Sequence, residues 1–189
     1  KKRKFDFSNF WGNGFTFYDE LGNFDQFDRD NIQDKIKKNY FDYIIYGSFT
    51  RSKFFIEEAK KSNSKIILID GEDNIDLSQN LDTKIAYFKR ELVEDVKNVF
   101  SINFSIPEKK IVNNINLNPE NLLAPLIPHR YKTYIYKNQN DYYKMWQNSI
   151  IGISYVWGGW WDALRYYEML MNGCIPLIQN LENCPKNSL

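Results

Sequence analysis

The strongest constraint on the fold is a pair of apolar runs that a short helix-forming segment separates. "FDYIIYGSF" (residues 41–49) and "IILIDGEDN" (66–74) are rich in β-branched and aromatic residues, which is typical of buried strands. "TRSKFFIEEAKKSNSK" (50–65) lies between them and favours a helix with an apolar patch. Strand, helix and strand with short connections predict a βαβ unit and therefore a parallel sheet. Because neither run alternates between apolar and polar residues, we expect both faces of the sheet to be covered.

The same pattern restarts in the second part of the chain. "KIAYFKREL" (84–92) and "VFSINFSIP" (99–107) predict further extended segments, and residues 112–130, with three prolines and many Asn, predict a linker. Strands and helices then alternate over "YKTYIY" (131–136), "NQNDYYKMWQNS" (138–149), "IIGISYVW" (150–157), "DALRYYEMLMN" (162–172) and "CIPLI" (174–178). The sequence thus predicts an α/β protein of two βαβ halves, residues 1–111 and 131–189, joined by the linker 112–130.

Composition narrows the classes of function. The net charge of +1 gives no electrostatic reason to expect a nucleic-acid partner. The two cysteines, Cys174 and Cys184, are too far apart for a CxxC motif and have no histidine nearby, so we expect neither zinc nor a disulfide framework. A reducing compartment fits them better, which indicates a cytoplasmic protein, with a peripheral membrane location as the alternative. No apolar run approaches the length of about 18 residues that a membrane span requires.

One segment, "GGWWDALRYYEMLMNGCIPLI" (158–178), contains both residues that would shape a helix and residues that could bind a ligand. Asp162 is placed to cap a helix, and Gly173 is placed to end it. The helix should pack on the sheet through the stripe Ala163, Leu164, Tyr167, Leu170 and Met171.

Gly158 and Gly159 lie where a strand ends and a helix begins, which is where open α/β sheets bind ligands. Bare glycine backbone there suits a diphosphate, although a tight turn without a ligand explains the pair equally well. Arg165 and Glu168 stand one helical turn apart and could form a surface ion pair of little energetic value. Alternatively, Glu168 accepts hydrogen bonds from two ribose hydroxyls while Arg165 meets a phosphate.

The segment resembles the nucleotide-sugar half of glycosyltransferases of the GT-B class. In that class, a glycine loop precedes a helix that bears a Glu. The strand after this helix begins with a four-residue motif: a small residue, Gly, any residue and Pro. "RYYEMLMNGCIPLI" looks closest to the exostosin-like and surface-polysaccharide transferases, and the resemblance puts Glu168 at the nucleotide-contacting Glu. A common bacterial pattern has a further Glu eight residues upstream, where this chain has Trp160. The resemblance implies a GT-B-like fold, in which two Rossmann-like βαβ halves face a cleft. Because the chain stops soon after the last predicted strand, the resemblance also implies an incomplete second half.

The earlier half is similar, more loosely, to the acceptor-side domain of α-1,3-fucosyltransferases. In that group a turn after the second strand carries a carboxylate, and Glu72 in "DGEDN" is its counterpart. Lys89 and Arg90 follow a short apolar strand, and such a cationic pair could neutralise a diphosphate leaving group without a metal. A solvated charge cluster is the other interpretation of the pair.

These resemblances imply a nucleotide-sugar-dependent glycosyltransferase in surface polysaccharide or glycoconjugate synthesis. An acceptor hydroxyl, on a glycan or a lipid-linked glycan, attacks the anomeric carbon while the nucleoside diphosphate leaves. The expected catalytic residues are Glu72 and Arg90. The expected donor-binding residues are Lys89, Gly158, Gly159, Arg165 and Glu168. No metal site and no cofactor besides the donor substrate are expected. The alternatives are a nucleotide- or glycan-binding module without catalysis and an inactive fragment of a transferase.

Overall fold

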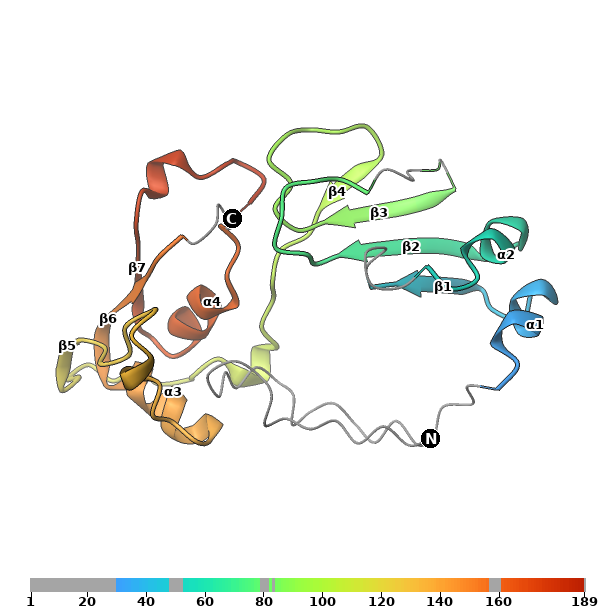
Figure 1. The fold of residues 1–189 in the computed structure, drawn as a ribbon. Helices are drawn as coiled ribbons and strands as arrows, with labels where there is room; N and C mark the ends of the chain where they lie inside the picture. Colours follow the sequence, from blue (N-terminus) through green and yellow to red (C-terminus); the bar gives the residue numbers. More distant parts are fainter. Residues whose placement is uncertain (1–29, 48–52, 79–81, 83, 157–160, 189) are drawn as a thin grey trace. The chain divides into compact units, whose positions relative to one another are not determined.

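The computed structural model describes residues 30–47, 53–78, 82, 84–156 and 161–188. These residues form two compact units, each built on its own parallel sheet (Figure 1). The four-stranded unit comprises the described residues within 28–103, 157–162 and 182–189, and the three-stranded unit comprises residues 104–156 and 163–181. Residues 104–111, expected at the end of the N-terminal domain, group here with the three-stranded unit.

The four-stranded sheet forms from the apolar runs of the first half. Its strands are all parallel and lie in the order of the sequence: β1 (Tyr43–Tyr46), β2 (Lys65–Asp70), β3 (Ile85–Lys89) and β4 (Val99–Ser101). Helix α2 (Ile56–Lys61) connects β1 with β2. The predicted strand, helix and strand, and the parallel sheet that they imply, are therefore confirmed.

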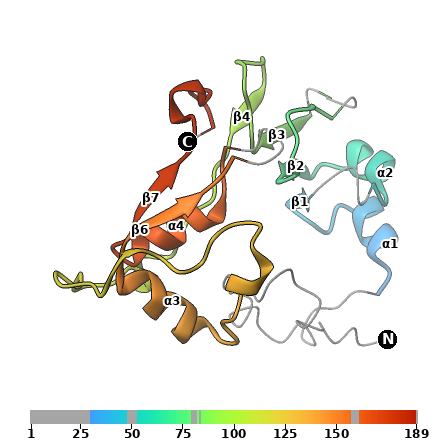
Figure 2. The ribbon, with the colours of Figure 1, turned by 60° about the vertical axis from the view of Figure 1, so that its left-hand side comes forward.

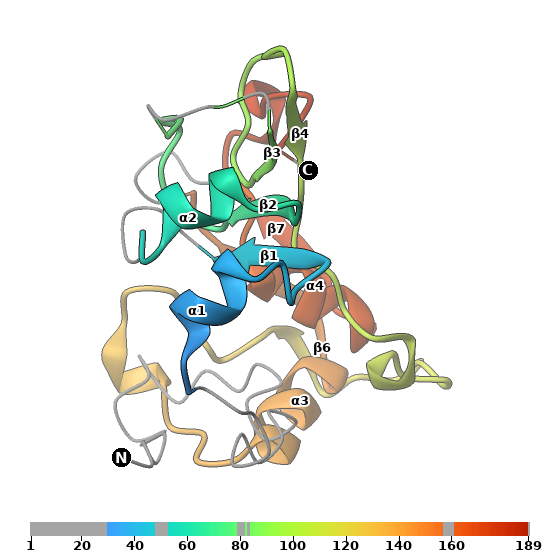
Figure 3. The same ribbon diagram turned by 90° about the vertical axis from the view of Figure 1, so that its right-hand side faces the viewer.

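Helix α1 (Ile32–Lys37) precedes the sheet and was not predicted. It lies beside α2, as Figure 3 shows, and Gln33 of α1 donates a hydrogen bond of 2.6 Å to Glu58 of α2. Ile36 of α1 packs into the same core as Ala59 of α2. The two helices thus cover the core on one side of the sheet.

The three-stranded sheet is also parallel and also follows the order of the chain. It contains β5 (Asn121–Leu123), β6 (Ser149–Ser154) and β7 (Ile175–Ile178), and it connects them through α3 (Gln139–Gln147) and α4 (Leu164–Met171). The range 112–130, expected to be a linker, contains β5. The strand expected at 131–136 is wrong, because Tyr131–Thr133 forms a 3₁₀ helix, η6, next to irregular backbone. Two more 3₁₀ turns are η5 (Glu108–Lys110) and η7 (Leu181–Asn183).

Gly152, in the middle of β6, allows the two helices of this unit to approach the sheet (Figure 2). A Cβ atom at this position would stand 2.7 Å from Met169 Sδ of α4 and 2.8 Å from Trp146 Cζ3 of α3. Real Cβ atoms do not come so close to other heavy atoms, so only glycine fits without repacking. Helices α3 and α4 therefore meet over one glycine on the same face of the sheet.

Helix α4 ends as predicted but packs differently. Gly173 has φ +77°, and the amides of Gly173 and Cys174 donate to the carbonyls of Leu170 and Met169, which is a Schellman motif. The expected packing stripe is wrong at Leu170, which is 60% exposed. The side chains of α4 that are buried are Tyr166, Glu168, Met169 and Met171.

Only one face of each sheet is covered by the described residues, so the expectation of two covered faces is wrong for this part of the chain. On the four-stranded sheet, Ile45 is 61% exposed and Phe100 53% exposed, while Leu68 and Tyr87 on the opposite face are buried. Topology explains the difference. Right-handed crossovers that always move to the next strand in the same direction place their connections on the same face.

No helix of the described residues has both the length and the apolar character that crossing a membrane requires.

Candidate functional site

A buried carboxylate marks the three-stranded unit. Glu168, in the middle of α4, is 4% exposed, and its Oε2 accepts a hydrogen bond of 2.8 Å from the hydroxyl of Tyr142 in α3. Its other oxygen, Oε1, is buried and has no hydrogen-bond partner among the residues that the structure describes. A buried carboxylate oxygen without a donor is costly, so this atom offers an acceptor to a ligand that brings one.

The surroundings of Glu168 favour its neutral form. Burial raises the pKa of this carboxyl group to about 7, although the hydrogen bond from Tyr142 and the charge of Arg165 partly oppose the shift. Burial and the neighbouring Glu168 also raise the pKa of Tyr142, which keeps its hydroxyl a donor. Glu168 therefore titrates near neutral pH and can serve as either acceptor or donor.

Arg165 lies one turn before Glu168, but its hydrogen bond goes to a different residue. Its Nη2 donates to the hydroxyl of Tyr134 at 3.4 Å, and the guanidinium carbon lies 5.8 Å from the centre of the Tyr134 ring. A direct ion pair between Arg165 and Glu168 is not found among the described side chains, although the two charges influence each other. Buried Nε of Arg165 has no described hydrogen-bond partner either. We name Tyr134, Tyr142, Arg165 and Glu168 the Glu168 cluster. It thus contains one donor and one acceptor that no described residue satisfies.

The backbone brings the Glu168 cluster together from three segments. Tyr134 follows η6, Tyr142 belongs to α3, and Arg165 and Glu168 belong to α4, which follows the carboxyl end of β6. Ligands of open α/β sheets bind near these carboxyl ends. Gly158 and Gly159, the expected diphosphate-binding glycines, lie outside the described residues.

A second polar network lies in the four-stranded unit, where β2 ends. Asp70, the last residue of β2, accepts a hydrogen bond of 2.5 Å from the hydroxyl of Tyr87 and one of 3.1 Å from the amide of Glu72. The Tyr87 oxygen in turn accepts from the amide of Ser78 at 3.1 Å. These bonds fasten both ends of the segment 71–78, which carries Glu72.

Lys89 fixes the same segment from the end of β3. The side chain is wholly buried, and its Nζ donates to the carbonyl oxygen of Asn74 at 2.6 Å and lies 3.7 Å from Asp70 Oδ2. Burial lowers the pKa of Lys89, and the neighbouring Asp70 opposes the shift. The expected role of Lys89 in donor binding stays a prediction. Through these contacts, Lys89 positions the loop 71–78, which carries Glu72.

Arg90 is almost as buried as Lys89 and connects the loop with a distant segment. Its Nε donates to the carbonyl oxygen of Gly71 at 3.3 Å, its Nη1 donates to that of Asp162 at 2.5 Å, and its Nη2 pairs with Asp73. Residues 71, 73 and 162 all belong to the four-stranded unit. Arg90 is therefore buried and bonded to other residues of its unit, so it does not belong to a solvated charge cluster.

Glu91 completes this arrangement in a rare backbone conformation. Its φ is 61°, and its buried carboxylate accepts hydrogen bonds from the amides of Trp161 at 3.0 Å and Asp162 at 2.6 Å. The predicted capping role of Asp162 is wrong, because the N-cap of α4 is Ala163 without a side-chain bond. The backbone of Asp162 is held instead by Glu91 and Arg90.

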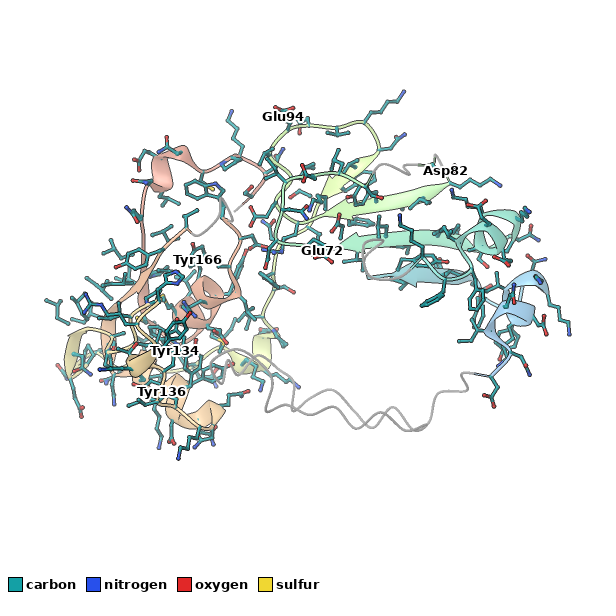
Figure 4. All side chains as sticks on the ribbon, viewed as in Figure 1. Glu72, Asp82, Glu94, Tyr134, Tyr136 and Tyr166 are labelled. Atoms are coloured by element: carbon teal, nitrogen blue, oxygen red, sulfur yellow. The ribbon has the colours of Figure 1, made fainter. Side chains whose placement is uncertain are left out.

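Glu72 is half-buried in the loop that leaves β2 (Figure 4). Its backbone is the part that the network fixes, since its amide binds Asp70 and its carbonyl oxygen lies 3.4 Å from Lys89 Nζ. Its role as a base stays a prediction. Within the described ranges, no group of three His, Cys, Asp or Glu side chains is placed to hold a metal ion.

The tyrosines that surround Glu168 were not predicted from the sequence. Tyr142 lies in "NDYYKMW", where a tyrosine in a helix is ordinarily explained by packing, and nothing in the pattern indicates a bond to a residue 26 positions later. Tyr134 lies in a segment that was expected to be a strand. Figure 4 shows Tyr134 and Tyr136 on the segment that leads into α3.

Comparisons with family models, with curated proteins and with solved structures found no match for this chain.

Proposed function

We propose that the chain acts as a nucleotide-sugar-dependent glycosyltransferase, in which the Glu168 cluster holds the nucleotide. The observation that carries the proposal is the buried Glu168 Oε1, which has no donor among the described residues. A ribose hydroxyl would supply that donor, and the unsatisfied Nε of Arg165 would suit a phosphate oxygen. The two parallel sheets are compatible with Rossmann-like halves, and the resemblance of residues 158–178 to the GT-B class adds the reaction type.

The proposed reaction exchanges one C–O bond for another. The acceptor oxygen bonds to the anomeric carbon, the bond from that carbon to the diphosphate breaks, and the nucleoside diphosphate leaves with the electron pair. The acceptor proton passes to a base, for which Glu72 is the candidate, if the reaction inverts the configuration. Lys89 and Arg90 hold the Glu72 loop.

The first test is a thermal-shift screen of the full chain with UDP-, GDP- and CMP-sugars, because a ligand that binds the native state raises the melting temperature. Binding should persist in EDTA, since the proposal assigns no metal. A strict requirement for Mg²⁺ or Mn²⁺ would contradict the proposed class.

The second test asks whether Glu168 binds the ligand or only stabilises the fold. Glu168→Ala should weaken nucleotide-sugar binding by roughly ten- to a hundredfold, which corresponds to about 1.5–3 kcal/mol of charge-assisted hydrogen bonds. Glu168→Gln, which keeps the volume and one acceptor, should cost less. Glu120→Gln, at an exposed position of the same unit, is the control. A structural role predicts lower melting temperatures in both Glu168 variants with unchanged affinity per folded molecule.

The alternative function is a nucleotide- or glycan-binding module without catalysis. Both functions predict binding of a nucleotide sugar, and only a transferase releases nucleoside diphosphate in proportion to glycosylated acceptor. Measuring both products with the donor that gives the largest thermal shift decides between them.

A further inference from the structure

The four-stranded unit contains a pocket of about 740 Å³ beside the edge strand β1. Helix α1 lines it with Ile32 and Ile36, and residues 44–47 of β1 and its end form another wall. Phe54 and Phe55 before α2 and residues 71 and 72 after β2 complete it. Both the size and the largely apolar lining are those of sites that bind small organic molecules.

The pocket walls expose apolar side chains that a bound molecule would cover. Phe54 is 74% exposed and Ile45 is 61% exposed. The wall is nevertheless fixed, because the hydroxyl of Tyr46 donates to the carbonyl oxygen of Phe54 at 3.1 Å. Phe55 has φ 60°, a conformation that is costly for a bulky residue and that concentrates at functional sites.

Among the described residues that line this pocket, Glu72 is the one that carries a charge. The end of the pocket near Glu72 also contains Gly47 and Gly71, and a Cβ atom added at either glycine would meet no described atom within 4 Å. Neither glycine has a positive φ. Among the described residues, the carboxyl ends of β1 and β2 therefore border a space beside the Glu72 carboxylate, which can accept hydrogen bonds from hydroxyl groups and disfavours an anionic group.

We propose that this pocket binds an amphipathic molecule, with an aliphatic or aromatic body between α1, β1 and Phe54 and a polyhydroxyl head beside Glu72. The site follows from the four-stranded unit alone. Only its interpretation as the acceptor site, with the acceptor hydroxyl next to the candidate base, rests on the proposed function. In that case the acceptor carries an apolar group.

The test measures binding of hexyl β-glucoside to the full chain by calorimetry, without any nucleotide sugar, so its outcome is independent of the proposed transfer. Methyl β-glucoside has the same head without the body, and hexyl sulfate has the same body with an anionic head. We expect hexyl β-glucoside to bind at least about tenfold more tightly than either.

Two variants locate the binding. Gly47→Leu should fill the pocket and weaken the binding of hexyl β-glucoside by at least about tenfold, with Gly47→Ala intermediate. Glu72→Gln should weaken the glucoside severalfold and allow hexyl sulfate to bind, whereas Glu94→Gln, at an exposed site of the same unit, should change neither. Absence of glucoside binding, equal binding of hexyl sulfate to the unaltered chain, or undiminished binding by folded Gly47→Leu would overturn the proposal. Should Gly47→Leu not fold, the ligand series and Glu72→Gln still decide it.

Discussion

The hydroxyl of Tyr142 in α3 lies 2.8 Å from Glu168 Oε2 in α4, so one hydrogen bond between two helices satisfies half of a buried carboxylate. The other half, Oε1, has no described partner. Because Oε1 is buried without a donor, Glu168 lowers the stability of the folded state and is also the best candidate for a ligand contact. The first two predictions test how Glu168 affects stability.

Tyr142→Phe should lower the free energy of unfolding by about 1–3 kcal/mol, because Glu168 would lose the donor to Oε2 and keep both oxygens buried. Urea unfolding at neutral pH measures the change. Tyr131→Phe removes the same atom from an exposed ring and should have almost no effect. Equal stability of the two variants would contradict the role assigned to Tyr142.

Glu168 should make the protein less stable as the pH rises. Burial raises the pKa of its carboxyl group from 4.5 to about 7, so the folded state holds this proton more tightly than the unfolded state. The contribution of Glu168 is therefore complete below about pH 4.5, decreases through about pH 7 and is lost above it, by up to about 3 kcal/mol. Urea unfolding of the parent and of Glu168→Gln across this range should show the decrease only in the parent.

Gly152→Val should destabilise the three-stranded unit by about 1–3 kcal/mol or more, because the new side chain collides with Met169 and Trp146. Gly71→Ala is a suitable comparison, since a Cβ there meets no described atom within 4 Å. Thermal unfolding of both variants provides the measurement. A stable Gly152→Val would mean that α3 and α4 do not pack over β6 as described.

Lys89→Met should lower the free energy of unfolding by about 3–5 kcal/mol, since it breaks a buried pair with Asp70 and releases the carbonyl oxygen of Asn74. It should also speed amide hydrogen exchange in the segment 71–78. Lys84→Met changes an exposed lysine at the start of the same strand region and is the matched control. If exchange in 71–78 is unchanged, Lys89 does not position the Glu72 loop.

The strands were predictable because apolar runs such as "IILID" have few alternatives to burial in a sheet. Helix α1 was missed because its only apolar residues are Ile32 and Ile36, too few for a clear period. The segment 131–136 has the composition of a strand, yet Thr133 Oγ1 accepts from the amide of Ile127 and donates to the carbonyl oxygen of Arg130. Those local bonds close a turn that composition does not encode.

The candidate site was predictable only in part, for a similar reason. Sequence spacing placed Arg165 and Glu168 on one helix but gave α4 the wrong buried face, because that face depends on the space that Gly152 leaves for Met169. The burial of Lys89 and Arg90 depends on the carbonyl groups of residues 71–74, which lie far from them in sequence. Tertiary contacts of this kind decide whether a charge faces solvent, and a single sequence does not contain them.

The crossing of the chain between the units has a consequence for the order of folding. Each sheet adds its strands in the order of the chain, so strands that pair with each other are also consecutive in the sequence. However, Glu91 binds the amides of residues 161 and 162, and Asn187 binds Ser101 and Asp95 of the four-stranded unit. These bonds cannot form until residues 161–188 have left the ribosome. The first sheet to be synthesised is thus the last to acquire its full set of native contacts.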